Sequence, residues 1–123
     1  MKKITILLSA LLALSFIGCK SNNTPEQVVL NFYQATQEND FHQALNYTNL
    51  AQEEQEQVIQ VLDQMGMVIH SYNVIESNID EGDSTAVVTL HLVTSNAYNP
   101  DTVGNDLDIP CVKVGGDWKV KFI

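Results

Sequence analysis

Apolar positions follow a helical period in the first half of this chain and an alternating period in the second half. The first helical stripe consists of Val28, Val29, Phe32, Tyr33 and Thr36. Spacings of three and four residues place them on one face of an α-helix. Thr24 and Pro25 precede the stripe, and these residue types suit the cap and the first turn of a helix. We therefore expect a helix to begin near Thr24.

Two further helices are expected before residue 66. Asn39 and Asp40 interrupt the first helix, and an aspartate is a good cap for the one that follows. The apolar side of the second helix is formed by Phe41, Ala44, Leu45 and Thr48. A third helix is expected over residues 50–65, with an apolar stripe of Val58, Val61, Leu62 and Met65. Such a stripe normally faces the protein interior.

From residue 67 onward the pattern is that of β-strands. Residues 67–79 are rich in β-forming side chains, and the turn DEGD follows at residues 80–83. The next strand has an apolar even-numbered face made of Ala86, Val88, Leu90 and Leu92. Alternation of this kind is typical of a strand with one buried face.

The last third of the chain predicts two more strands. A polar loop is expected at residues 96–105. Leu107 and Ile109 then place the apolar residues at odd-numbered positions, whereas beyond Pro110 the apolar residues are even-numbered valines. A phase shift at a proline predicts a bulge on an edge strand. The final strand alternates Trp118, Val120 and Phe122 with Lys119 and Lys121.

Helices followed by a meander of four strands predict an α+β fold with the helices on one face of the sheet. Three segments carry a resemblance: residues 24–29 (TPEQVV), 38–45 (ENDFHQAL) and 116–120 (GDWKV). In this order they resemble bacterial lipoproteins of unknown function in the nuclear transport factor 2-like (cystatin-like) superfamily. The resemblance covers residues 24–123 and implies a curved four-stranded antiparallel sheet. Its motifs are structural, and none of them is catalytic.

The start of the chain predicts export. A cationic start with Lys2 and Lys3 precedes an uncharged apolar run at residues 4–17 and then Gly18 and Cys19, which are the parts of a signal peptide. Residues 16–19 (FIGC) resemble a bacterial lipobox, although Phe16 stands where leucine is commonest. We therefore expect a signal peptide at residues 1–18, a lipidated tether at 19–23 that starts at Cys19, and one domain at 24–123. The expected location is the cell envelope, on the outer membrane facing the periplasm.

Charge and cysteine content narrow the classes of partner. Without residues 1–18 the chain keeps four lysines and no arginine against fifteen acids, a net side-chain charge of −11. A nucleic-acid-binding protein needs a basic surface, so nucleic acid is excluded as a partner. If Cys19 carries lipid, Cys111 is left without a disulfide partner, and we expect it to be a buried strand residue.

No metal or cofactor is predicted. The three histidines, His42, His70 and His91, have no spacing typical of metal ligands. Asp101, Asn105 and the aspartates after them do not match a calcium-binding loop. Asp83-Ser84-Thr85 and Asp101-Thr102-Val103 resemble the O-glycosylation motif of Bacteroidetes, so Ser84 and Thr102 are candidate glycosylation sites.

Three functions are consistent with the sequence. A binding pocket lined by Tyr33, Tyr47, Tyr72 and His91 is one expectation, because tyrosine combines apolar area with a polar tip. The resemblance implies a cone that in some members holds a carboxylate–histidine pair, which makes His91 the candidate base of a small enzyme. His91 is, however, on the odd-numbered, less apolar face of its strand.

The third function is docking of a protein. If Trp118 and Val120 are buried, we expect Lys113, Lys119 and Lys121 to share the opposite face of the final hairpin. Such a patch suits an acidic partner, or it protects a sheet edge from unwanted pairing. The favoured hypothesis is a lipid-anchored, non-enzymatic protein that binds a small ligand or a periplasmic protein. The alternatives are a small enzyme and a purely structural or inhibitory protein.

Overall fold

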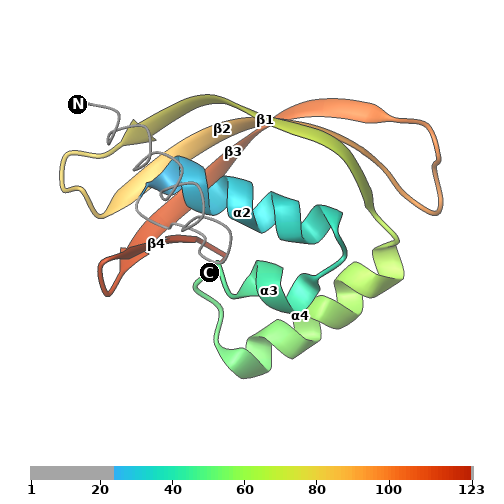
Figure 1. The fold of residues 1–123 in the computed structure, drawn as a ribbon, viewed down its shortest axis with the longest axis horizontal. Coiled ribbons are helices and arrows are strands. Elements are labelled where there is room, and N and C mark those ends of the chain that lie inside the picture. The colour runs from blue at the N-terminus through green and yellow to red at the C-terminus, as the bar shows by residue number, and fades with distance from the viewer. Residues whose placement is uncertain (1–23, 123) are drawn as a thin grey trace, which may run out of the picture.

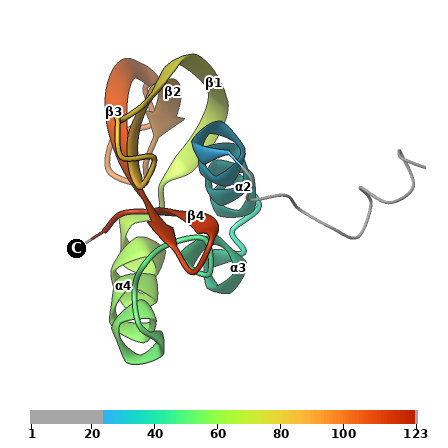
Figure 2. The same ribbon diagram turned by 90° about the vertical axis from the view of Figure 1, so that its left-hand side faces the viewer.

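The computed structural model describes residues 24–122 (Figure 1). Its elements are α2 (Pro25–Gln37), α3 (Phe41–Leu45), α4 (Gln52–Met65), β1 (Val68–Ile79), β2 (Thr85–Ser95), β3 (Val103–Val114) and β4 (Asp117–Val120). The strands form one antiparallel sheet in the order β1-β2-β3-β4. The sheet curves over α2, with α3 and α4 beyond that helix (Figures 1 and 2). The predicted α+β fold, with helices on one face of a curved four-stranded antiparallel sheet, is confirmed.

The predicted signal peptide and Cys19 lie outside the described residues. Among residues 24–122, no helix combines the length and the apolar character needed to cross a membrane.

Helix α2 begins where the sequence predicts. Thr24 Oγ1 accepts a hydrogen bond from Gln27 N at 3.1 Å, which satisfies one of the free amides of the first turn. The predicted stripe is buried: Val28 and Val29 are fully buried, and Tyr33 is 9% exposed. This face lies against the sheet and forms the centre of the core.

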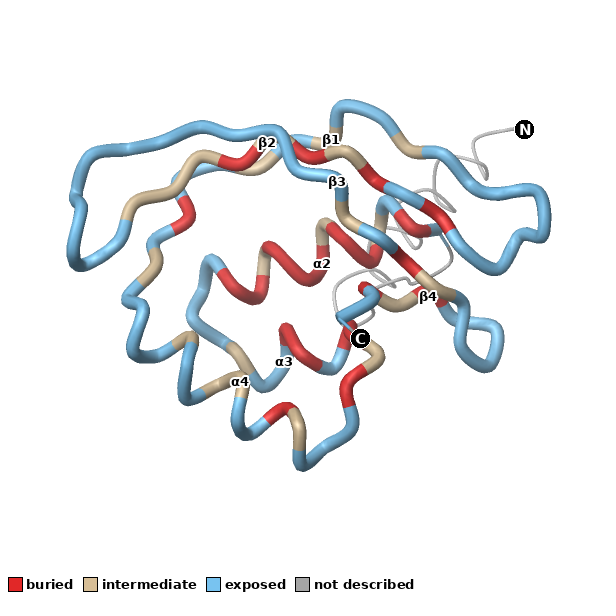
Figure 3. Tube along the Cα trace, turned by 180° about the vertical axis from the view of Figure 1, so that it is seen from behind, coloured by how far each residue is buried: buried red, intermediate tan, exposed pale blue. Residues whose placement is uncertain are grey.

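The core lies between α2 and the concave face of the sheet (Figure 3). The predicted even-numbered face of β2 is buried throughout, at Ala86, Val88, Leu90 and Leu92. Trp118 and Cys111 are buried as well, so the expected burial of both residues is confirmed. Phe122 lies beyond the end of β4 and is 43% exposed.

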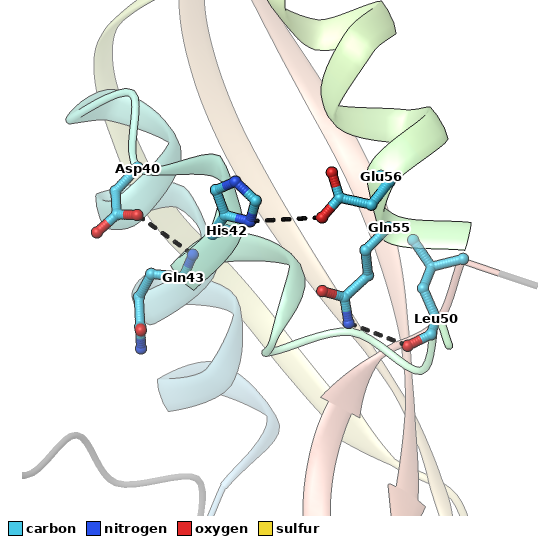
Figure 4. A network of polar contacts seen from close by, with 6 residues as sticks. All are labelled: Asp40, His42, Gln43, Leu50, Gln55 and Glu56. Carbon is cyan, nitrogen blue, oxygen red and sulfur yellow. Dashed lines mark hydrogen bonds and ion pairs between the residues drawn. The ribbon is translucent and has the colours of Figure 1, made fainter. Parts of the chain in front are cut away.

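Short polar contacts hold the corner between α3 and α4 (Figure 4). Asp40 Oδ1 accepts a hydrogen bond from Gln43 N at 3.3 Å and so caps α3. The buried Gln55 donates from Nε2 to Leu50 O at 3.1 Å. His42 Nδ1 lies 3.9 Å from Glu56 Oε2 across the two helices, with both side chains exposed.

The predicted packing of α4 is wrong. Val61 is 56% exposed and Met65 is 43% exposed, and Gln55 is the buried residue of this helix. The cause is position: α4 packs mainly against the short α3 rather than under the sheet. Val58 and Leu62 are half-buried.

The predicted bulge at Pro110 is also wrong. The β2–β3 register runs unbroken from Thr85↔Val112 to Thr94↔Val103. Leu107, Ile109 and Cys111 are opposite inward-facing residues of β2, so the buried phase of β3 continues past Pro110. The register shifts are in β1, where such irregularities increase the curl of a strand.

Strand β4 is much shorter than the strand beside it. It pairs with β3 only between Cys111 and Val114, so residues 103–110 have no strand on that side among the described residues. On its other side, Val120 N donates to Tyr47 O at 2.7 Å, and Val120 O accepts from Asn49 N at 3.1 Å. The segment between α3 and α4 therefore covers the outer edge of β4.

Gly66 ends α4 with a φ of +58°. A second glycine with a similar φ serves as the control for a test of how closely Gly66 is packed. Gly115 has nearly the same φ, +59°, but a Cβ there meets nothing within 4 Å, whereas one at Gly66 would lie 3.1 Å from Ala97 Cβ. Both alanine variants should lose about 1 kcal/mol to left-handed strain, and Gly66→Ala should lose measurably more in urea unfolding. Equal losses would contradict the close approach of Ala97 to this turn.

Candidate functional site

A cavity of about 340 Å³ lies between α2 and the concave face of the sheet. Helix α2 contributes Phe32, Tyr33 and Thr36 to its wall. The sheet contributes Leu92 and the part of β3 that β4 leaves uncovered, including Leu107 and Ile109. The volume falls at the lower end of the range for small-molecule sites.

The remaining wall comes from α4 and from the chain that leaves β4. Helix α4 contributes Leu62, and the chain that leaves β4 contributes Lys121 and Phe122. The phenyl ring of Phe122 lies 6.0 Å from that of Phe32, centroid to centroid, in an edge-on arrangement. The cavity is thus partly open, and the C-terminal segment forms one of its rims.

The wall is almost entirely apolar. Its polar side chains among the described residues are Tyr33, Thr36 and Lys121. Thr36 Oγ1 already donates to Phe32 O at 2.8 Å, inside its own helix. The described lining residues include no carboxylate and no histidine. The arrangement favours an apolar molecule with few polar groups.

Tyr33 is the lining tyrosine. Its ring packs edge-on against Phe32 with centroids 4.9 Å apart. Burial raises the pKa of Tyr33 to about 12, because desolvation disfavours the phenolate. The hydroxyl therefore stays neutral near pH 7 and can both donate and accept a hydrogen bond.

The predicted tyrosine pocket is only partly assembled. The ring of Tyr72, on β1, lies 6.5 Å from that of Tyr33 but does not reach the cavity wall. Burial, and to a smaller degree the Glu38 carboxylate, raise the pKa of Tyr72. Tyr47 is buried beside β4, where its hydroxyl accepts a hydrogen bond from Gln43 Nε2 at 3.0 Å. Of the three predicted pocket tyrosines, Tyr33 lines this cavity, and Tyr47 and Tyr72 do not.

His91 lies on the opposite face of the sheet from the cavity and does not line it. Its Nδ1 is 2.7 Å from Asp106 Oδ1, with the two side chains 41% and 62% exposed. The imidazole lies over Gly104, where a Cβ would come within 3.3 Å of the ring. The odd-numbered position of His91 in β2 explains this placement, and the sheet separates it from the cavity.

The structure does not bring the three lysines of the predicted patch onto one face. Lys113 is directly opposite Trp118 in the hairpin, so both are on one face, and its Nζ lies 5.4 Å from the centroid of the indole ring. Lys119 reaches the other way and donates from Nζ to Asn46 O at 3.0 Å. Lys121 is at the cavity. The two-residue turn determines which residue of β3 lies opposite each residue of β4. The alternation of apolar residues from Trp118 onward does not contain this information.

The other candidate sites are simpler. Residues 24–122 contain no group of three or more potential metal ligands. Burial raises the pKa of the Cys111 thiol to about 12, which keeps it protonated and unreactive near pH 7. Ser84 and Thr102 are exposed, in the segments between β1 and β2 and between β2 and β3. Their glycosylation stays a prediction.

The raised pKa of Tyr33 predicts a pH dependence of stability. The folded protein holds this proton up to about pH 12, while the unfolded chain releases it near the ordinary value of 10.0. The associated stability, roughly 3 kcal/mol, is complete below pH 10 and is lost as the pH rises to 12. Tyr33→Phe should therefore make the fall in unfolding free energy between pH 10 and 12 shallower. An unchanged slope in urea melts across this range would contradict the burial of the hydroxyl.

No protein-family model matches the chain, and no curated protein matches its sequence significantly. Similar solved structures include a protein named as a nuclear transport factor 2-like transpeptidase from Campylobacter jejuni, with 18% identity, a TM-score of 0.56, and 80% of this chain and 98% of that one covered. A ketosteroid isomerase-like protein from Erwinia carotovora atroseptica has 11% identity and a TM-score of 0.59 over 81% and 91% of the two chains.

A third similar structure is a SEC-C motif-containing protein from Psychrobacter arcticus, with 12% identity, a TM-score of 0.61, and 82% of this chain and 60% of that one covered. Likeness at such low identity shows a shared fold, and one fold carries many unrelated functions. The chain therefore has the nuclear transport factor 2-like fold that its sequence motifs predict.

Proposed function

We propose that the protein is an exported, lipid-anchored, non-enzymatic binding protein that holds a small apolar ligand in the cone between α2 and the sheet. The observation that supports this most is the composition of the cavity wall. A space of about 340 Å³ is surrounded mainly by apolar side chains, together with the neutral Tyr33. Each methylene group that a ligand buries in such a space contributes about 0.8 kcal/mol, so affinity should rise about fourfold per carbon.

Binding is favoured over catalysis because of what faces the cavity. Proton abstraction needs a base within hydrogen-bond reach of the reacting group. None of the described lining residues is a carboxylate or a histidine, and His91 is on the far face of the sheet, paired with Asp106. The activities named for the similar structures belong to those proteins.

A small ligand is also favoured over a protein partner. The docking hypothesis depended on three lysines sharing one face, and Lys113 and Lys119 are engaged with Trp118 and Asn46 instead. The cavity, in contrast, is already formed.

Filling the cavity tests the proposal. Leu107 lines the cavity and is 37% exposed, whereas Val87 is 38% exposed and projects from the opposite face of the sheet. Leu107→Trp should weaken binding of the neutral fluorescent probe N-phenyl-1-naphthylamine by about tenfold or more, while Val87→Trp should not. His91→Ala should bind as the wild type does.

Urea melts of the variants check that each one is folded before its affinity is compared. Equal probe affinities in Leu107→Trp and Val87→Trp would place the binding site elsewhere and overturn the proposal.

The lipid anchor is the second part of the proposal, and it rests on the lipobox-like residues that end at Cys19. Four residues lie between Cys19 and Thr24, and the five chain steps from one to the other span at most ~18 Å. An anchored protein would thus hold the start of α2 close to the membrane. The β1–β2 turn and the β3–β4 turn lie at this same end of the molecule (Figures 1 and 2).

Cys19→Ser tests the anchor. The variant should no longer incorporate radioactive palmitate and should leave the membrane fraction, because the thiol that carries the lipid is gone. Stable anchoring takes more than one acyl chain, and in this protein every such chain would depend on Cys19. Persistent labelling, or continued fractionation with membranes, would contradict the lipobox interpretation.

A further inference from the structure

Lys121 is the one charged residue among the described residues that line the cavity. It stands in a chain with six basic and fifteen acidic side chains. A lysine at the rim of an apolar cavity in such an acidic protein is an uncommon placement. Lys113 and Lys119 make their contacts on different faces of the β3–β4 hairpin.

The backbone holds Lys121 firmly in place. Its own N–H donates to Pro110 O at 2.9 Å. The next N–H, that of Phe122, donates to Asn49 Oδ1 at 2.8 Å. Because hydrogen bonds fix the chain on both sides, the lysine stem starts from a defined point on the rim.

The ammonium group of Lys121 is available for a ligand. None of the carboxylates within residues 24–122 forms an ion pair with it. The acids of neighbouring β3 face away: Asp106 is held by His91 on the outer face of the sheet, and Asp108 Oδ1 accepts from Thr89 Oγ1 at 2.8 Å there.

We propose that the cavity takes an aliphatic acid, with its hydrocarbon chain against Leu92 and Ile109 and its carboxylate on Lys121 Nζ. This rests on the proposed binding function and names its ligand class. At ~30 Å³ for a group the size of a water molecule, about 340 Å³ holds about eleven such groups. A chain of about ten carbons fits that space.

The net negative charge of the protein does not exclude an acid. At physiological ionic strength, charges more than ~8 Å apart are largely screened from one another. An acid at the rim therefore responds mainly to Lys121, and the buried part of the ligand meets no opposing carboxylate among the described lining residues. A cationic ligand of the same length would place its charge beside the lysine.

Calorimetric titration with decanoate, 1-decanol and decylamine tests this ligand class, because the three differ only in their polar end. In wild-type protein, decylamine should bind most weakly. Lys121→Met should weaken decanoate binding by about tenfold or more, the loss expected for one charge-assisted hydrogen bond. The same variant should change decanol binding less than about twofold.

Two controls isolate the charge at the rim. Lys113→Met removes an equal charge on the same hairpin and should leave decanoate affinity unchanged, and Lys121→Arg should retain it. Raising the salt concentration should weaken decanoate binding to wild type but not to Lys121→Met.

The outcomes separate this inference from the function on which it rests. If decanol binds but Lys121→Met leaves decanoate affinity intact, or if Lys113→Met lowers it equally, the acid proposal is overturned and the apolar site stands. Tighter binding of decylamine than of decanoate would also overturn it. If neither decanoate nor decanol binds, the proposed function fails together with the inference.

Discussion

A mismatch in length between α2 and the sheet is the constraint on which the rest of the structure depends. β1 and β3 each have 12 residues and, at ~3.3 Å per residue, extend about 40 Å. Helix α2 has 13 residues and, at ~1.5 Å per residue, covers about 20 Å. One helix therefore cannot fill the concave face, and α4, which packs on α3, does not complete it. The unfilled part is the cavity.

The short β4 determines where that cavity opens. Because β4 pairs only with the last residues of β3, the inward side chains of Leu107 and Ile109 are left beside open space rather than beside another strand. The chain then leaves the sheet and places Lys121 and Phe122 along the same opening. The same feature thus accounts for the apolar wall and for Lys121, the one cation among its described residues.

The sequence predicts the fold better than the site. The stripe of α2 and the alternation of β2 predict those elements correctly, because each element has one buried face. The packing of α4 and the face of Lys113 depend on long-range contacts and on turn register, which local periodicity does not contain. Most cavity residues were missed because Leu92 and Ile109 look like ordinary core residues. The feature that could indicate the cavity is a final strand far shorter than the strand before it.

The folded protein holds an apolar cavity, open at one rim, between α2 and β3. Crystals of the domain equilibrated with xenon test this directly, because apolar cavities take up this gas. The account predicts a strong anomalous peak bounded by Tyr33, Leu92 and Ile109. A chain of ordered waters in this space, or side chains that fill it and leave no xenon peak, would contradict the account.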